Sequence, residues 1–339
     1  MCEKMNEDWR MTNEDRKDFW DTLCILDGKN MQEDIARLAK VIKYPRFLFR
    51  YRSVNNKSLT ALSENKLYFS SANYYDDPFD TYLRIDHDEV CNGIEMAWQR
   101  KNSNGQEFMN FAKGMGVSEE CINEILSNVN LNFIQKFSYE YLKTMRSQIR
   151  KEIYSVCFSD TWKNENLWLK YADQHKGFTV VYDIEDNSRF MCGKESICEQ
   201  CMMKDIPMPL YPVYYSDVKY DATVYARDFA TYKLLQYFNN QQVNELLNSF
   251  SPRPWESEKI SLIKKKCHEY DREWRSILSI PYQEGKIFSK KWKPYGVILG
   301  LNIEETEKKL VLLAAKEACI ENVFAVKIAA DDELGIIQI

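Results

Sequence analysis

The stretch Tyr270–Leu278, YDREWRSIL, is where the fold and the site of this chain can first be worked out. Its residues alternate in character, which is typical of a β-strand. Successive side chains of a strand point to opposite faces, so Asp271, Glu273 and Arg275 share one face and Trp274 points to the other. Two interpretations stay open: the charged face is an ordinary salt-bridged sheet surface, or it lines a cleft where a carboxylate meets a positive group.

The composition predicts a folded globular protein. With 339 residues the chain can form two units, or one domain with large insertions. Its aromatic content of 14% excludes a largely disordered chain. A net charge of -5 argues against a positive electrostatic field over the whole protein that would attract nucleic acid or an anionic membrane. A local basic patch remains compatible with this charge.

The sequence predicts a cytoplasmic protein that does not span a membrane. The N-terminal residues lack the apolar region of a secretory signal, and no apolar run approaches the roughly 20 residues that a transmembrane helix needs. In that reducing compartment we expect thiols rather than disulfides. Cys192, Cys198 and Cys201 are either a zinc site, since two of them have the CxxC spacing, or reduced cysteines in a loop.

The order of the elements favours an α+β fold. Residues 1–45 read as an N-terminal helical extension, and residues 46–339 as an α+β core that contains a helical insertion over residues 88–151. Strands alternate with helices of unequal length, unlike the regular alternation of a doubly wound sheet. The motifs of P-loop NTPases, dinucleotide-binding Rossmann folds, zincins and α/β-hydrolases are absent, which makes these classes unlikely.

Arginines in an early strand provide a second charged face. Arg50 and Arg52 in FRYRS lie two residues apart and therefore share one face of the strand. They either pair with the acids of the late strand on a solvent-facing sheet, or line a cleft with them.

Two further segments carry polar and aromatic candidates. The first is NKLYFSSANYYDDPFD, with Tyr68, Ser70, Ser71, Asp76, Asp77, Phe79 and Asp80. The second is LWLKYADQHKG, in which Trp168 and Tyr171 are either site residues or the core face of an amphipathic helix. His175 next to Gly177 is either a ligand contact or a surface histidine near the helix end.

Five segments together resemble a bacterial family called domain of unknown function 2971. These segments are LFRYRS, LYFSSANYYDDPFD, LWLKYADQHKG, EYDREWRSI and YGVILGLNI, in this order. The resemblance runs from Phe47 to the C-terminus and is interrupted by the helical insertion. The family name itself implies no activity.

The same segments more distantly resemble the ADP-ribosyltransferases, whose His-Tyr-Glu or Arg-Ser-Glu residues come from three separate strands. Arg50 matches the first position, Tyr68 the second and Glu273 the third, with Ser70 or Ser71 as the alternative second residue. The match is a hybrid, because the arginine belongs to one subclass and the tyrosine to the other. The resemblance implies a mixed or antiparallel split sheet and NAD as the substrate.

On this resemblance, each residue has an expected role. Glu273 stabilises an oxocarbenium-like ribose, as carboxylates do in glycoside hydrolysis. Arg50 or Arg52 contacts the pyrophosphate or the adenosine ribose, and Tyr68 stacks on nicotinamide. The NAD-contacting residues would be Arg52, Ser70, Ser71, Asp77, Phe79, Tyr171, His175 and Arg275, and no metal is expected. The acceptor would be a protein or nucleic acid, and the role that of a toxin or antiphage defence effector held by an inhibitory partner protein.

Two other functions stay open. Lys264, Lys265 and Lys266, and the lysines around Trp292 in FSKKWKPYG, suggest a nucleic-acid-binding protein or a nuclease. In the nuclease, the acidic loop of Asp76, Asp77 and Asp80 would gather Mg²⁺. The third possibility is a non-catalytic regulatory protein in which the charged positions are structural.

Overall fold

A computed structural model describes residues 10–99, 110, 113–114, 116–128, 131–185, 190–191, 209–237, 254–330 and 332–339. Its fold is α+β with a mixed, mostly antiparallel sheet, which confirms the fold class that the sequence predicts. The cysteines considered for zinc, Cys192, Cys198 and Cys201, lie outside the described residues.

The strands of the main sheet follow the order β13-β12-β11-β4-β1-β3-β2-β10-β5, with β9 paired to β3 and β6 paired to β9. Their bounds are β1 Phe47–Arg52, β2 Lys66–Ser71, β3 Ile153–Ser159, β4 Phe178–Asp183, β5 Phe190–Met191, β6 Tyr211–Pro212, β9 Glu273–Ser279, β10 Phe288–Trp292, β11 Gly296–Leu299, β12 Asn322–Ile328 and β13 Leu334–Gln338. Two short strands, β7 Tyr214–Tyr215 and β8 Ile263–Lys264, pair in parallel beside it.

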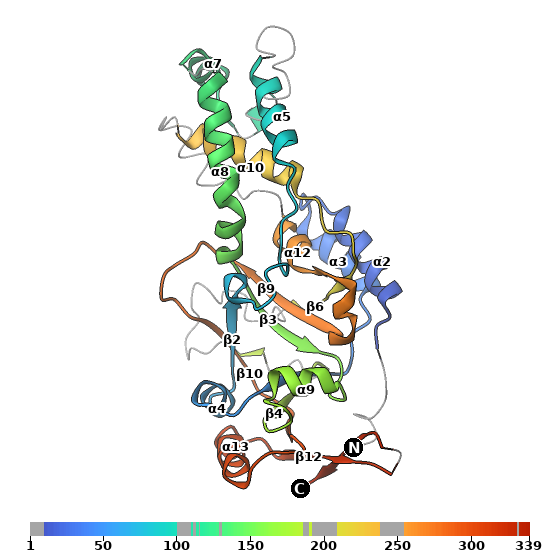
Figure 1. Cartoon of the computed structure of the whole chain (residues 1–339). Helices are drawn as coiled ribbons and strands as arrows, with labels where there is room; N and C mark the ends of the chain where they lie inside the picture. Colours follow the sequence, from blue (N-terminus) through green and yellow to red (C-terminus); the bar gives the residue numbers. More distant parts are fainter. Residues whose placement is uncertain are drawn as a thin grey trace.

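The helices surround and extend this sheet (Figure 1). Their bounds are α2 Asn13–Cys24, α3 Met31–Val41, α4 Asn56–Ser63, α5 His87–Gln99, α7 Glu119–Asn128, α8 Leu131–Glu152, α9 Glu165–Tyr171, α10 Thr223–Tyr237, α12 Glu256–Ser261 and α13 Glu305–Glu317. Two 3-10 helices are η1 Ala72–Tyr74 and η5 Lys266–Asp271. In the described part of the chain, no helix has the length and apolar character needed to cross a bilayer.

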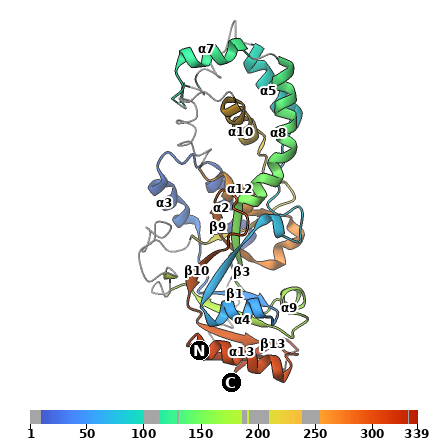
Figure 2. The ribbon, with the colours of Figure 1, turned by 90° about the vertical axis from the view of Figure 1, so that its left-hand side faces the viewer.

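Helices α5, α8 and α10 pack against one another and form an arm that projects from the sheet, as Figures 1 and 2 both show. Helix α8 leads into β3 without a loop, because Glu152 is its last residue and Ile153 is the first residue of the strand. The arm is therefore continuous with a central strand of the sheet.

The N-terminal helices belong to the main core. Helix α2 begins with a capping box in which Thr12 and Asp15 satisfy each other's backbone N–H groups. Its apolar side chains Phe19 and Leu23 are fully buried in the same cluster as β3 and β9. The Arg16 guanidinium is 2% exposed and lies 3.1 Å from the Asp160 carboxylate, just after β3.

Candidate functional site

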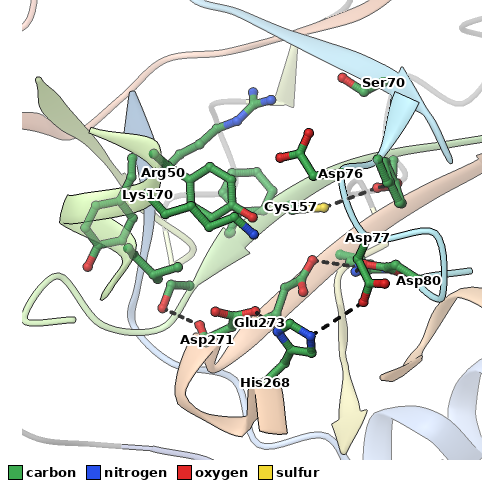
Figure 3. A pocket seen from close by; sticks show the side chains of 18 of the residues that line it. Arg50, Ser70, Asp76, Asp77, Asp80, Cys157, Lys170, His268, Asp271 and Glu273 are labelled. Carbon is green, nitrogen blue, oxygen red and sulfur yellow. Dashed lines mark hydrogen bonds and ion pairs between the residues drawn. The ribbon is translucent and has the colours of Figure 1, made fainter. Parts of the chain in front are cut away.

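A pocket opens over the central strands β1, β3 and β9, with a cavity of about 260 Å³. Its lining comes from these strands, from the segment Ser70 to Asp80, from α9 and from η5 (Figure 3). Elements that are far apart in the sequence thus converge on one cavity.

The sheet topology explains why the pocket forms. One edge of β3 pairs with β9 along its whole length. The other edge pairs with β1 only at Ser159 and with β2 only at Ser155 and Tyr154. Strands β1 and β2 therefore separate beside the middle of β3, and Cys157 lies on that stretch, between Arg50 and Glu273 in Figure 3.

Glu273 projects into this pocket as a buried carboxylate, 7% exposed. Arg275 Nε donates a 2.7 Å hydrogen bond to its Oε1, and Lys264 Nζ donates a 3.1 Å bond to its Oε2. The strand begins at Glu273 because Arg272 has a φ of +48°, which ends the preceding 3-10 helix. Only part of the strand predicted over YDREWRSIL forms, because Asp271 belongs to η5 and β9 begins at Glu273. Asp271, Glu273 and Arg275 nevertheless all line the pocket rather than a solvent-facing sheet surface.

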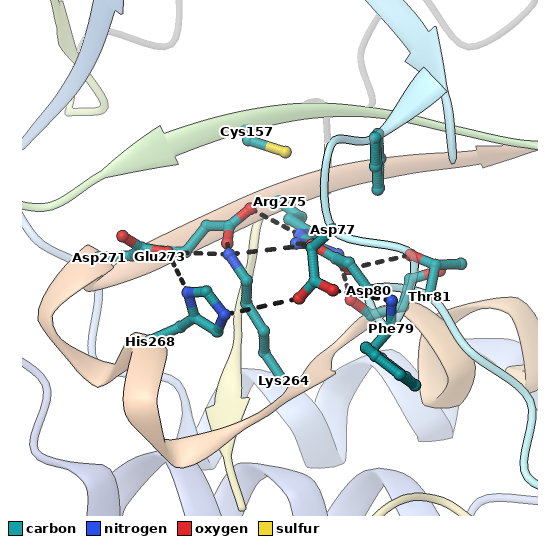
Figure 4. A network of polar contacts seen from close by, with 12 residues as sticks. Asp77, Phe79, Asp80, Thr81, Cys157, Lys264, His268, Asp271, Glu273 and Arg275 are labelled. Carbon is teal, nitrogen blue, oxygen red and sulfur yellow. Dashed lines mark hydrogen bonds and ion pairs between the residues drawn. The ribbon is translucent and has the colours of Figure 1, made fainter. Parts of the chain in front are cut away.

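A network of ion pairs extends from Glu273 (Figure 4). Both terminal nitrogens of Arg275 donate to Asp80, at 2.8 and 2.6 Å, in a bidentate pair. Lys264 also donates to Asp271 at 2.8 Å. Three carboxylates thus share two cations, so the network carries a surplus negative charge when all five groups are ionised.

The pKa values of the two neighbouring acids Glu273 and Asp271 shift in opposite directions. Burial raises the pKa of Glu273, but Arg275 and Lys264 outweigh burial and hold that pKa well below its usual range. Burial raises the pKa of Asp271, and here the cations do not reverse the shift. The pocket therefore combines a carboxylate that stays ionised with a carboxyl group that binds a proton more readily, a pattern found at acid–base sites.

The opposite wall of the pocket is cationic. Arg50 and Arg52 are partly buried, and burial lowers the pKa of both. For Arg52, burial and the nearby charge of Arg50 lower the pKa to about 9. Among the described residues, no carboxylate forms an ion pair with either guanidinium; Arg50 donates only to the carbonyl oxygen of Tyr68, at 3.4 Å. Buried cations without a counterion favour an anionic ligand.

His268 and Asp77 close one side of the pocket. His268 Nε2 lies 3.5 Å from an Asp77 carboxylate oxygen, and its Nδ1 lies 3.8 Å from Asp271. The histidine comes from η5 and the aspartate from the loop after η1, so this contact joins these two segments at the side of the pocket.

Most of the residues predicted from the sequence meet at the pocket. Those that line it are Arg50, Arg52, Ser70, Asp77, Tyr171, Glu273 and Arg275. The remaining four, Tyr68, Ser71, Phe79 and His175, do not.

The four residues outside the pocket have other contacts. The Tyr68 hydroxyl lies 3.5 Å from Glu64 and Tyr68 does not line the cavity, so the expected stacking of Tyr68 on nicotinamide has no geometric support. Ser71 donates to the carbonyl oxygen of Arg150 at 3.1 Å. His175 stacks on Trp168 with ring centroids 5.7 Å apart. Phe79 is 48% exposed on the outside of its loop.

Sequence reasoning missed several residues of the site. In the sequence Lys264 belongs to a lysine run, yet in the structure it is buried in the ion-pair network. Ser155, Cys157 and Ser159 line the pocket, and their small polar side chains at every second position of IYSVCFS are a signal that could have found them. His268 gave no sequence signal, because its role depends on the contact with Asp77.

The structure does not support two observations behind the nuclease hypothesis. Trp292 is 1% exposed and packs against Tyr182, with ring centroids 4.6 Å apart, so it cannot stack on a base. Asp80 is engaged by Arg275, and no group of three or more metal-ligating side chains occurs within the described ranges.

Comparison of the chain with family models, with curated proteins and with solved structures gives no match.

Proposed function

We propose that this protein binds NAD in the pocket and breaks its bond between ribose and nicotinamide, as an ADP-ribosyltransferase or an NAD glycohydrolase does. One observation carries the proposal: two partly buried arginines, which have no carboxylate partner among the residues that the structure describes, lie across the pocket from an ionised, buried glutamate. NAD carries the complementary charges: its pyrophosphate is anionic and its nicotinamide ring is cationic.

The pocket walls suit the two halves of this substrate. Arg50 and Arg52 would hold the pyrophosphate, for which the guanidinium fork is a good partner. Glu273 would hold the ribose next to the bond that breaks. The cavity of about 260 Å³ is smaller than the roughly 300–1,000 Å³ of sites that enclose drug-sized ligands. We therefore place the nicotinamide riboside half inside it and the adenosine half along the open side.

The reaction follows from the protonation states. The bond from ribose C1′ to the nicotinamide nitrogen breaks, and its electron pair leaves with nicotinamide, which becomes neutral. The ribose becomes oxocarbenium-like, and the carboxylate of Glu273 stabilises that positive charge. An acceptor oxygen or water then bonds to C1′ and loses a proton, for which Asp271 with its raised pKa is the candidate base. In a cell, this reaction would deplete NAD or modify a target molecule. Either effect would suit a toxin or an antiphage defence effector.

Nicotinamide release from NAD by the purified protein tests the proposal. We expect Glu273→Gln to reduce turnover by at least about 100-fold, the size of effect seen when one transition-state contact is removed. Glu256→Gln is the matched control, because Glu256 is also buried and ion-paired but does not line the pocket. A wild-type protein that neither releases nicotinamide nor shows an NAD-dependent rise in melting temperature would refute the proposal.

A further inference from the structure

Four cations surround the loop that carries Asp77 and Asp80. They come from three separate parts of the chain: Arg146 and Arg150 on α8, Lys219 before α10, and Lys265 after β8. Together with the aromatic side chains Phe79 and Tyr82 of the loop, they form what we call the basic patch. In the sequence, Phe79 is a predicted NAD contact and Lys265 belongs to a lysine run, but no pattern predicts that these six residues lie together.

The two arginines of the basic patch bind backbone rather than acids. Arg146 Nε donates to the carbonyl oxygen of Leu83 at 2.9 Å, and its guanidinium lies 4.9 Å from the centre of the Tyr82 ring. Arg150 donates to the carbonyl oxygens of Ala72 and Pro78, at 2.8 and 2.5 Å. Each contact satisfies donors but leaves the positive charge uncompensated.

The two lysines flank the exposed ring of Phe79. Lys265 Nζ lies 4.3 Å from the ring centre, and Lys219 Nζ lies 5.3 Å from it while donating to the carbonyl oxygen of Phe79 at 2.5 Å. Within the part of the chain that the structure describes, no carboxylate lies within ion-pairing distance of any of the four cations.

Nearby acids offset this charge only in part. Burial lowers the pKa of Lys219, Asp77 and Asp80 oppose that shift, and Lys265 and Arg150 add to it. The acids that act on Lys219 are Asp77 and Asp80, but Asp80 is engaged by Arg275 and Asp77 faces His268. The protein as a whole is acidic, so this local positive surplus is a departure from its average surface.

We propose that the basic patch binds single-stranded nucleic acid, with phosphates on its four cations and a base stacked on Phe79. A cationic surface with an accessible aromatic ring is the usual platform for single strands, because every base offers a flat face. In a duplex the bases are already stacked, and an acidic peptide offers no ring for Phe79. Figure 4 shows the Phe79 ring on the side of the ion-pair network away from Cys157, so this surface is separate from the NAD pocket.

Fluorescence anisotropy with a short labelled DNA or RNA single strand tests this surface. The slope of log K against log salt should be close to -3 if all four cations contact phosphates, since each contributes about 0.7 on a single strand. Lys219→Gln with Lys265→Gln should flatten the slope by about 1.4. Phe79→Ala should weaken binding about tenfold at constant salt, whereas Phe79→Tyr should restore it.

A pair of lysines outside the basic patch provides the control. Lys290→Gln with Lys291→Gln removes the same charge from strand β10 and should leave the affinity within about twofold of wild type. The proposal is overturned if this pair weakens binding as much as the patch pair does, if Phe79→Ala binds like wild type, or if a duplex or a polyglutamate peptide binds equally well. NAD turnover need not change in any of these variants, so the two proposals fail separately.

Discussion

The guanidinium of Arg16 donates a 2.7 Å hydrogen bond from Nη1 to the carbonyl oxygen of Glu273. The same nitrogen donates to the carbonyl oxygen of Val213, and the Glu273 N–H donates to the Tyr215 hydroxyl at 2.7 Å. The backbone of the pocket glutamate is therefore fixed by side chains behind the sheet, one of which comes from the N-terminal helix α2. This helix supports the site although it contributes nothing to the pocket lining.

We expect Arg16→Met to destabilise the protein by about 3 kcal/mol, because it removes one member of a buried ion pair and leaves Arg272 as the remaining cation that pairs with Asp160. The estimate is at the low end of that class, since Asp160 keeps its contacts with Arg272 and Trp274. Urea unfolding measures the change. Arg37→Met is the control, because the Arg37–Glu33 pair is solvent-exposed and contributes about 0.5 kcal/mol or less. Equal losses in both variants would contradict this account of Arg16.

The contribution of Glu273 to stability should depend on pH. Its folded-state pKa lies well below the ordinary value of 4.5, so its ion pairs stabilise the protein above that pH and lose this effect as the pH falls toward the folded-state pKa. The difference in unfolding free energy between wild type and Glu273→Gln should be about 3 kcal/mol at neutral pH and should shrink below pH 4.5.

Urea unfolding at several pH values measures this difference. Glu305→Gln is the control, because Glu305 is an exposed helical glutamate. Its unfolding free energy should differ little from that of wild type, and the difference should hardly vary with pH. A Glu273→Gln difference that grows as the pH falls would mean that the carboxyl is protonated in the folded protein.

Arg52→Gln should raise the melting temperature of the ligand-free protein while weakening NAD binding. A partly buried cation whose pKa falls to about 9 through burial and the charge of Arg50 costs free energy until an anion neutralises it. We expect a gain of about 1 kcal/mol in stability. Thermal unfolding with and without NAD measures both effects. A variant that is less stable without ligand would show that Arg52 supports the fold rather than the ligand.

Cys157 should not react with iodoacetamide at pH 8 in the folded protein. Burial and the charge of Glu273 raise the pKa of this thiol to about 12, so almost none of it is thiolate. The exposed thiols Cys267 and Cys319 provide the internal control, because they should be alkylated under the same conditions. Peptide mass spectrometry after the reaction distinguishes them. Rapid labelling of Cys157 would indicate a reactive thiol and a different chemistry for the pocket.

The sequence by itself determined which charged residues share a face on two strands of the site. The alternation in YDREWRSIL assigned Glu273 and Arg275 to one face, and FRYRS did the same for Arg50 and Arg52, because strand geometry with a period of two is local. Nearer to the site, helix α12 ends at Ser261 and strand β8 follows. There, Lys264 is buried and forms ion pairs with Asp271 and Glu273, and also with Asp80, which is far away in the sequence.

Only the tertiary structure decided which charges meet. Register on β3 brings Glu273 opposite Ser159 and separates β1 from β2 beside Cys157, which opens the pocket. The tertiary structure also gathers the basic patch from residues far apart in the chain. Such contacts cannot be read from a single sequence, since ion pairs and unpaired charges are set by distances between segments, whereas alternation is set within one segment.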